Sequence, residues 1–328
     1  MSGPRVLAIE TSCDETGVAV VSGGRRIASN QVATQIALHA TTGGIVPEVA
    51  ARQQLRWIVP TVQAAMAEAD VDWDDLDAVA VTSGPGLIGS LLVGVNVAKA
   101  LAVVHDLPLV GINHVEGHIY ANWLTDAPAE DPLPPEPPFP LLCLVVSGGH
   151  TQLVLMDGHG RYRLLGLPYP GGPAISAAAE GASAATRFPR ARTAGAYDFS
   201  FSGLKTAVLR EVAGYRDRGA PIPIDGLAAA FEEAVVDALA TKTVAAAEEH
   251  AVAAVAIGGG VAANRSLRTT LRQRLDALGL PLLVPPPAWC TDNGAMIGAA
   301  AGFRFLAGDR AGPALEATPN LSLAWAEG

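Results

Sequence analysis

The chain has 328 residues, enough for two domains of ordinary size. Half of the residues are hydrophobic, 16% are charged and the net charge is −10, which argues against a protein that simply coats nucleic acid. The N-terminus predicts no signal peptide, and the most apolar region, residues 77–104, is too interrupted by glycine, proline and polar residues for a membrane span. Three separate cysteines without a CxxC pair indicate neither a disulfide framework nor a cysteine zinc site, so we expect a cytoplasmic protein.

The first predicted element is a hairpin over residues 6–21, in which two apolar strands flank a polar turn that carries Asp14 and Glu15. Residues 79–102 then read as a strand, a glycine-rich turn and a helix. The glycines of that turn fit either tight packing or a ligand site, and the pattern does not separate the two.

The stretch NHVEGH, residues 113–118, places His114 and His118 four residues apart. On a helix this spacing puts both imidazoles on one face, where they could bind one metal ion. The zinc-protease pattern HExxH needs a glutamate directly after the first histidine, but Val115 stands there and Glu116 would point away from the shared face. By itself the pair fits a metal site or two core histidines.

Residues 126–140 are rich in proline and acids and predict a linker. A second hairpin follows over residues 141–156, with a turn of hydroxyl residues and glycine whose backbone N–H groups can approach an anion. Two similar hairpins predict an α/β fold with duplicated architecture and a ligand cleft between its halves. We place the domains at 1–134 and 135–303, with a C-terminal helix over 304–328 that packs back on the first.

The remaining elements lie in the second half. Residues 187–205 mix basic and aromatic side chains, which fits either a solvated loop or a contact with nucleic acid. Residues 227–249 predict an amphipathic scaffold helix. Residues 251–275 read as a strand, three glycines and a helix that begins near Asn264, an arrangement that can bind phosphate or ribose oxygens.

Taken in order, nine stretches of this chain resemble one family, the tRNA N6-adenosine threonylcarbamoyltransferases (TsaD, formerly described as O-sialoglycoprotein endopeptidases). The stretches are AIETSCDETGVAV, LHATTGGIVPEVAAR, GPGLIGSLLVG, NHVEGH, VSGGHTQL, YPGGP, DFSFSGLKT, GGGVAANRSLR and CTDNGAMIG. They span roughly residues 6 to 300.

The resemblance implies an actin-like, sugar-kinase-like ATPase (ASKHA) fold with two domains around a nucleotide cleft. It also implies a metal-dependent acyltransferase that moves a threonylcarbamoyl group from threonylcarbamoyl-AMP to N6 of the adenosine next to the anticodon, in tRNAs that read codons beginning with A. Expected partners are tRNA, a TsaB-like paralogue and a TsaE-like ATPase, without a membrane.

The resemblance also implies site residues. His114, His118 and Asp292 match the family's ligands for one divalent ion, for which we expect Fe(II), with Zn(II) as an alternative that ligand type does not exclude. Asp14 and Glu15 match acidic residues near the reaction centre. The nucleotide and acyl-adenylate contacts map onto Ser147, Gly148, Gly149, His150, Thr151, Gly172 and Asn264.

One departure from the family pattern is a missing run of the form D-A-x-G-E-A-x-D-K, since the chain passes from Arg163 to Leu167 and on to the YPGGP turn without it. A catalytically impaired scaffold relative is therefore one alternative function. A metallopeptidase is a weaker one, because Glu116 is misplaced for a base. A small-molecule kinase of the same fold would leave His114, His118 and Asp292 unexplained.

Overall fold

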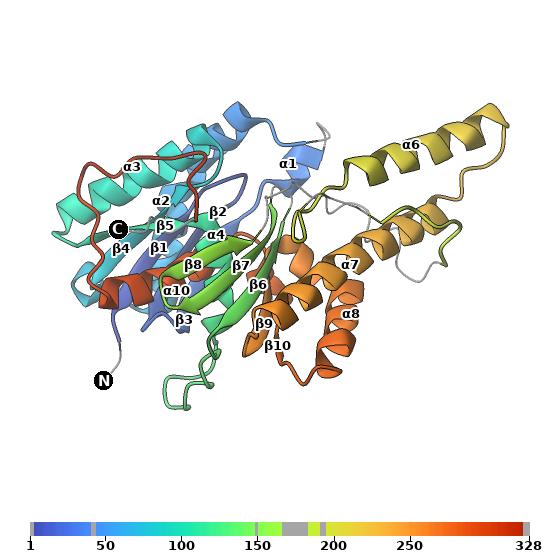
Figure 1. Cartoon of the computed structure of the whole chain (residues 1–328). Coiled ribbons are helices and arrows are strands. Elements are labelled where there is room, and N and C mark those ends of the chain that lie inside the picture. Colours follow the sequence, from blue (N-terminus) through green and yellow to red (C-terminus); the bar gives the residue numbers. More distant parts are fainter. Residues whose placement is uncertain (1–2, 41–43, 148–149, 166–182, 191–194, 324–328) are drawn as a thin grey trace. The chain divides into compact units, whose positions relative to one another are not determined.

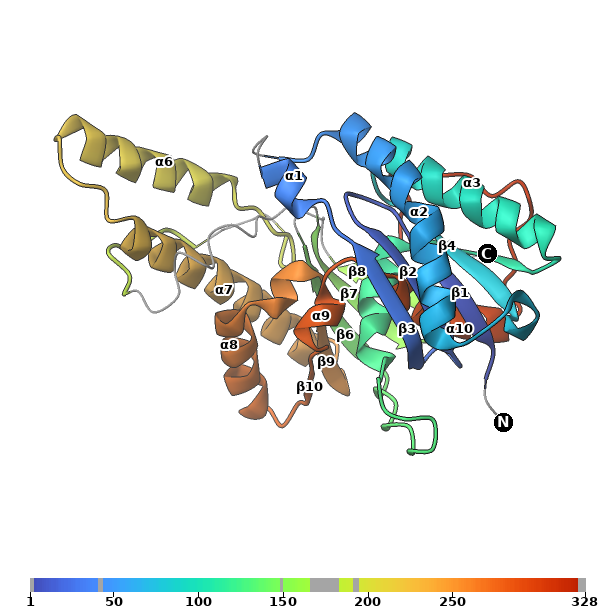
Figure 2. The ribbon, with the colours of Figure 1, turned by 180° about the vertical axis from the view of Figure 1, so that it is seen from behind.

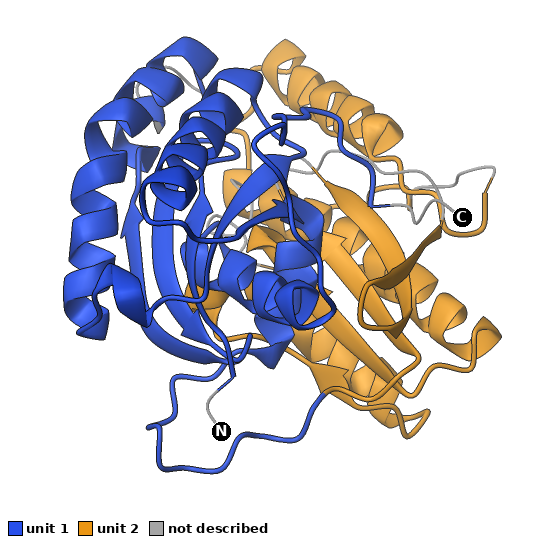
Figure 3. Cartoon of the chain, turned by 90° about the vertical axis from the view of Figure 1, so that its left-hand side faces the viewer, with its two compact units in different colours: residues 1–136, 291–324 blue, residues 137–290, 325–328 orange. Residues whose placement is uncertain are grey.

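The computed structural model describes residues 3–40, 44–147, 150–165, 183–190 and 195–323. The chain divides into two compact units, which Figure 3 shows in separate colours. Unit 1 comprises residues 1–136 and 291–324, and unit 2 comprises residues 137–290 and 325–328. None of the described helices combines the length and the apolar character that a bilayer span requires.

Unit 1 is built on a five-stranded mixed sheet in the order β3-β2-β1-β4-β5. The hairpin strands β1 and β2 pair antiparallel, whereas β1, β4 and β5 run parallel to one another, so their carboxyl ends meet at one edge. The strands are β1 (Arg5–Glu10), β2 (Thr16–Ser22), β3 (Arg26–Ala33), β4 (Ala78–Gly84) and β5 (Leu109–Asn113).

Helices cover both faces of this sheet (Figures 1 and 2). Because side chains alternate along a strand, Leu7 and Ile9 of β1 pack toward α2 and α3, where Ile58 meets them. Ala8 faces the opposite way, toward Gly298 of α10. The helical segments are α1 (Ile36–Ala40), α2 (Pro47–Ala69), η1 (Trp73–Asp75), α3 (Ile88–Val104), α4 (His114–Tyr120), η2 (Ala121–Trp123) and α10 (Gly294–Leu306).

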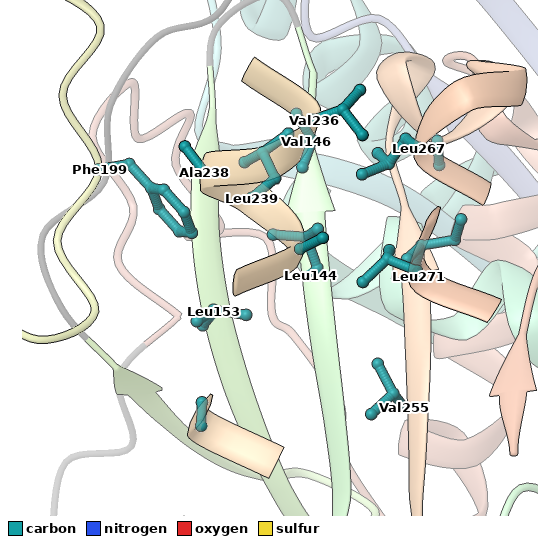
Figure 4. Packing of buried hydrophobic residues seen from close by; sticks show 14 of the residues in the cluster. Leu144, Val146, Leu153, Phe199, Val236, Ala238, Leu239, Val255, Leu267 and Leu271 are labelled. Carbon is teal, nitrogen blue, oxygen red and sulfur yellow. The ribbon is translucent and has the colours of Figure 1, made fainter. Parts of the chain in front are cut away.

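Unit 2 repeats the sheet pattern, with strand order β10-β9-β6-β7-β8. Its core joins the sheet to helices through side chains such as Leu144, Leu153, Leu239 and Leu271 (Figure 4). The elements are β6 (Leu141–Val146), β7 (Thr151–Gly158), β8 (Arg161–Leu165), α6 (Ser202–Asp217), α7 (Ile224–Glu249), β9 (Ala254–Gly258), η3 (Gly260–Ala263), α8 (Arg265–Asp276), β10 (Leu282–Leu283) and α9 (Pro287–Cys290).

The predicted duplication is confirmed at the level of the sheets. In each unit a central strand pairs antiparallel with its hairpin partner and parallel with a strand from much later in the chain. The two predicted hairpins are β1–β2 and β6–β7, and the predicted helix after the third glycine turn is α8.

The division of the chain differs from the expected one at its second boundary. Residues 291–303 belong to unit 1, not to the second domain, because α10 packs on β1 and β2. The approach is close: a Cβ on Gly294 would lie 2.5 Å from the Ala19 nitrogen, so only glycine fits.

The expected helix over residues 304–328 is also wrong, because α10 ends at Leu306 and residues 307–323 contain no helix. Instead, residues 311–321 form an extended strap along unit 1. The Ala311 N–H donates to the Leu109 carbonyl at 2.7 Å, and the Thr318 N–H donates to the Ser83 carbonyl at 2.7 Å. Glycine and proline in this segment disfavour a helix.

Candidate metal centre

The two histidines of NHVEGH lie at the edge where the parallel strands of unit 1 end. Strand β5 runs directly into α4, and the Asn113 side chain caps this helix by accepting the Val115 N–H at 2.9 Å. His114 and His118 are 5% and 1% exposed. Their ring centroids are 4.7 Å apart at an angle of 79°. The helical spacing therefore brings both imidazoles to one place, as predicted.

Asp292 reaches the same place from far along the chain. It precedes Asn293, which caps α10 by accepting the Met296 N–H at 3.0 Å. The Asp292 Oδ1 lies 3.5 Å from His114 Nε2 and 3.3 Å from His118 Nε2. One ligand atom from each residue lies within 4.8 Å of the other two. Within unit 1, the structure thus gathers the three predicted ligands.

The chemistry of this cluster suits a divalent cation. In the described part of the chain, neither ring nitrogen of buried His118 has a hydrogen-bond partner, because its contact with Asp292 lacks hydrogen-bonding geometry. An unsatisfied buried nitrogen is costly unless a ligand engages it. Two imidazoles and one carboxylate also leave coordination positions for substrate.

Carboxylates crowd around these ligands and shift their protonation. Burial, followed by the charge of Asp292, raises the pKa of Glu15 to about 9. Burial lowers the pKa of His114, but Asp292 and Glu10 overcome it and raise that pKa to about 9. The carboxylate charges that contribute to both shifts are ones that a bound cation would offset.

The β1–β2 turn holds Asp14 and Glu15 beside this cluster. The Gln54 amide donates to the carbonyls of Cys13 and Glu15 at 3.0 and 3.1 Å, and the Ser90 hydroxyl donates to the Cys13 carbonyl at 2.9 Å. Helices α2 and α3 therefore fix the backbone of the turn. Burial raises the pKa of the Cys13 thiol, which keeps it uncharged.

Glu116, which lies between the two histidines, serves another purpose. Its side chain is fully buried, and both carboxylate oxygens lie 2.9 Å from Arg304 Nε on α10. This ion pair ties α4 to α10 and occupies the only acid of NHVEGH. The peptidase alternative thereby loses its candidate base.

The second predicted loop, in unit 2, is only partly described. The Ser147 N–H donates to the His150 carbonyl at 2.7 Å, and the Ser147 hydroxyl accepts the His150 N–H at 3.2 Å. Thr151 opens β7 with a buried hydroxyl that has no hydrogen-bond partner among the described residues. The predicted contacts Gly148, Gly149 and Gly172 lie outside the described residues.

Asn264 caps the N-terminus of α8. Its Oδ1 caps the helix by accepting the Leu267 N–H at 2.7 Å, and its Nδ2 donates to Glu232 Oε1 at 2.6 Å. Gly259 has a φ of +87°, and a Cβ there would collide with the Val146 carbonyl, so the glycine turn packs against the end of β6. The sequence did not single out Glu232, because it lies in a helix whose pattern indicates scaffold.

The basic segment is partly neutralised within unit 2. Arg190 pairs with Glu233 at 2.7 Å and with Asp237 at 2.8 Å, both on α7, whereas Arg187 is exposed. Arg192 lies outside the described residues. Arg190 thus supports the fold and is not held ready for a phosphate.

Comparison with known proteins decides the family. The family model TsaD, tRNA N6-adenosine threonylcarbamoyltransferase, matches residues 26–299. The chain belongs to this family. A tRNA N6-adenosine threonylcarbamoyltransferase of Geobacillus thermodenitrificans is 49% identical, over 97% of this chain and 96% of its own length. One of Dehalococcoides mccartyi is 46% identical, over 97% and 99%.

Solved structures show the ASKHA fold. T. kodakarensis HypF aligns with a TM-score of 0.57 at 15% identity, over 94% of this chain and 48% of that one. Component A of the (R)-2-hydroxyglutaryl-CoA dehydratase of Acidaminococcus fermentans aligns with a TM-score of 0.50 at 13% identity, over 92% and 99%. Both sheets of this TsaD-family chain follow the duplicated pattern expected for that fold.

The alignment with the Geobacillus relative also bears on the missing run. It extends over 339 positions, more than the 328 residues of this chain, so that relative has residues without a counterpart here. This agrees with the short connection noted after Arg163. Residues 166–182 lie outside the described residues.

Proposed function

We propose that this chain transfers the threonylcarbamoyl group from threonylcarbamoyl-AMP to N6 of the adenosine beside the anticodon, in tRNAs that read codons beginning with A. The observation that carries the proposal is the near-complete match to relatives of that name. The gathering of His114, His118 and Asp292 supports it, because acyl transfer to a weakly nucleophilic amine needs an activated carbonyl.

The proposed reaction joins N6 of adenosine to the carbamoyl carbon and breaks the bond from that carbon to the phosphate oxygen, so AMP leaves and N6 loses a proton. His114, His118 and Asp292 would hold one divalent ion, Fe(II) or Zn(II), which when bound would polarise carbamoyl and phosphate oxygens as a Lewis acid. With a cation bound, its charge would favour the carboxylate form of these acids, and Asp14 or Glu15 would accept the proton that N6 loses.

In unit 2, Ser147, His150, Thr151 and Asn264 would contact the adenylate. What supports this role is the Ser147 loop and the buried hydroxyl of Thr151, which has no hydrogen-bond partner among the described residues. From the family alone, we also propose cytoplasmic action with a TsaB-like paralogue and a TsaE-like ATPase.

The test is reconstitution with tRNA, threonylcarbamoyl-AMP, a divalent metal and the proposed partner proteins. The double variant His114→Ala/His118→Ala should bind no metal at this site and lose the modified nucleoside by at least about 100-fold, because two of three ligands are gone. His105→Ala is the matched histidine control, since His105 stacks on Trp73 away from the cluster, and it should retain activity.

Three outcomes separate the alternatives. Nucleoside formation that depends on both histidines supports the transferase. Wild-type chain that binds metal and tRNA yet forms no nucleoside would instead support the impaired relative, and chelator-sensitive release of peptides from a protein substrate would support a peptidase.

A further inference from the structure

Glu10 is a buried acid directly behind the metal cluster, and the sequence pattern did not single it out. It is the last residue of β1 and is only 1% exposed. Its Oε2 lies 3.1 Å from Nδ1 of His114, the ring nitrogen opposite the one that faces Asp292. The carboxylate therefore contacts one candidate ligand from the side away from the ion's expected position.

The surroundings of Glu10 hold its carboxylate in place. Oε1 accepts the Ser12 N–H and Oε2 accepts the Thr82 hydroxyl, each at 2.5 Å. These partners meet because β1, β4 and β5 run parallel and end at the same edge, with Ile9 opposite Val81 and Thr82 opposite Ile112. Such a carboxylate is fixed in orientation before any ligand arrives.

We propose that Glu10 is a positioning residue for the metal centre, accepting the Nδ1–H of His114 so that Nε2 carries the lone pair that binds the ion. This inference rests on the proposed metal site. A neutral imidazole carries one proton, and the hydrogen bond made by one nitrogen decides which nitrogen is left to bind metal. An ionised carboxylate can only accept, so it selects the Nδ1–H form and increases the basicity of Nε2.

A second hydrogen-bonding group near His114 Nδ1 could select the other tautomer of the ring. The Ser12 hydroxyl lies 3.0 Å from the same Nδ1. If that hydroxyl donated to Nδ1, the imidazole proton would sit on Nε2, which faces Asp292, and the nitrogen could not bind an ion. Glu10 opposes that form, and the Ser12 oxygen can then share the Nδ1–H as a second acceptor.

The two histidines are unequal in this respect. Among the described residues, Nδ1 of His118 has no hydrogen-bond partner, so only His114 has a carboxylate behind it. The second buried acid nearby, Glu116, pairs with Arg304. Glu10 and Glu116 thus form a matched pair: both are buried carboxylates, Glu116 on α4 and Glu10 at the end of β1, and of the two only Glu10 is shown to contact a ligand.

The first measurement is Zn²⁺ affinity by competition with a chromophoric chelator, using the full chain. Glu10→Gln should weaken binding by about 10- to 100-fold, the usual effect of losing such a partner. Glu116→Gln removes a buried charge of equal size and should lower thermal stability while keeping the wild-type affinity. Ser12→Ala, which removes the other group at Nδ1, should also keep it.

The second measurement identifies the nitrogen of His114 that binds the ion. In ¹⁵N-histidine spectra of the Zn²⁺-loaded wild-type chain, His114 should carry its proton on Nδ1 and bind Zn²⁺ through Nε2, and Zn²⁺-loaded Glu10→Gln should show a mixture of the two ring nitrogens as ligand. Unchanged affinity in Glu10→Gln, or Zn²⁺ bound through Nδ1 of His114, would overturn the inference. Neither readout involves tRNA, so if both effects are measured but the wild-type chain makes no nucleoside, only the proposed function is refuted.

Discussion

At the scale of single residues, Glu15 shows how strongly the cluster needs a cation. Its ordinary pKa is 4.5, and burial together with Asp292 raises it to about 9 in the metal-free chain. Below pH 4.5 the folded and the unfolded chain both hold this proton. Between about 4.5 and 9 only the folded chain holds it, so the free energy of unfolding falls as the pH rises through that window.

Glu15→Gln should therefore stabilise the metal-free chain at pH 8 by at least about 1 kcal/mol, because the amide has no charge to bury. The measurement is denaturant unfolding of wild type and variant from pH 4 to 9. The two curves should coincide near pH 4 and diverge as the pH rises. Parallel curves would show that Glu15 titrates normally.

The raised pKa of His114 also makes the free energy of unfolding fall as the pH rises. The protonated ring contributes stability that is fully present below pH 6.5 and is lost as the pH rises through about 9. Both groups lower the free energy of unfolding as the pH rises. Comparison of Glu15→Gln with wild type therefore separates the contribution of Glu15 from that of His114.

Single residues also show where sequence reasoning reaches its limit. The spacing of His114 and His118 indicated a shared face, and family motifs supplied Asp292. The sequence did not predict the partners of Glu10 and Glu116. Each acid sits in an unremarkable local pattern, and its role depends on a side chain from another element that only the fold brings near.

At the scale of elements, the close contact of α10 with β2 positions Asp292. A Cβ on Gly17 would lie 2.7 Å from the Gly294 nitrogen, so the first turn of α10 sits almost against the strand backbone. Asp292 lies two residues before that turn. Any separation of helix and strand should move the third ligand away from the histidines.

Gly294→Ala should thus destabilise the chain by about 1–3 kcal/mol through overpacking and should also weaken Zn²⁺ binding. Gly203→Ala is the matched control, because Gly203 lies in the first turn of α6 and a Cβ there would have no atom within 4 Å. That control should be neutral or slightly stabilising, as alanine favours a helix. Equal stability and equal metal affinity in the two variants would contradict the positioning role of this contact.

Elements with strong local signals were predicted well. Both hairpins, the helix within 227–249 and the strand–turn–helix of residues 79–102 appear as β1–β2, β6–β7, α7 and β4–α3. The end of the chain was not, because its residues follow no periodic pattern. The strap's course is set by backbone hydrogen bonds to β4 and β5, which composition does not reveal.

At the scale of the whole molecule, unit 1 is assembled from two separate parts of the chain. Residues 291–323 supply α10, Asp292 and the strap, whose Leu321 carbonyl accepts the Asn113 amide at 3.3 Å. Asn113 in turn caps the helix that carries both histidines. The end of the chain therefore supports the metal site through its backbone.

A chain that stops after residue 310 should consequently show faster amide exchange in β4 and β5, and weaker Zn²⁺ binding, because it loses the hydrogen bonds to Leu109, Ser83 and Asn113. A chain that stops after residue 323 keeps the strap and should match the full chain. Hydrogen exchange with mass spectrometry measures the protection of β4 and β5 in the two truncated chains, and competition with a chromophoric chelator measures their Zn²⁺ affinity. Equal protection in the two truncated chains would show that the strap is dispensable.

The discontinuity of unit 1 has a further consequence during synthesis on the ribosome. Strands β1 to β5 and both histidines emerge first, yet the face of the sheet around Ala8 has no cover until α10 has been translated. Residues 137–290 of unit 2 are made in between, and they can fold before unit 1 is complete. The third metal ligand, Asp292, is made only after residues 137–290, so the site gains its full set of protein ligands late in synthesis.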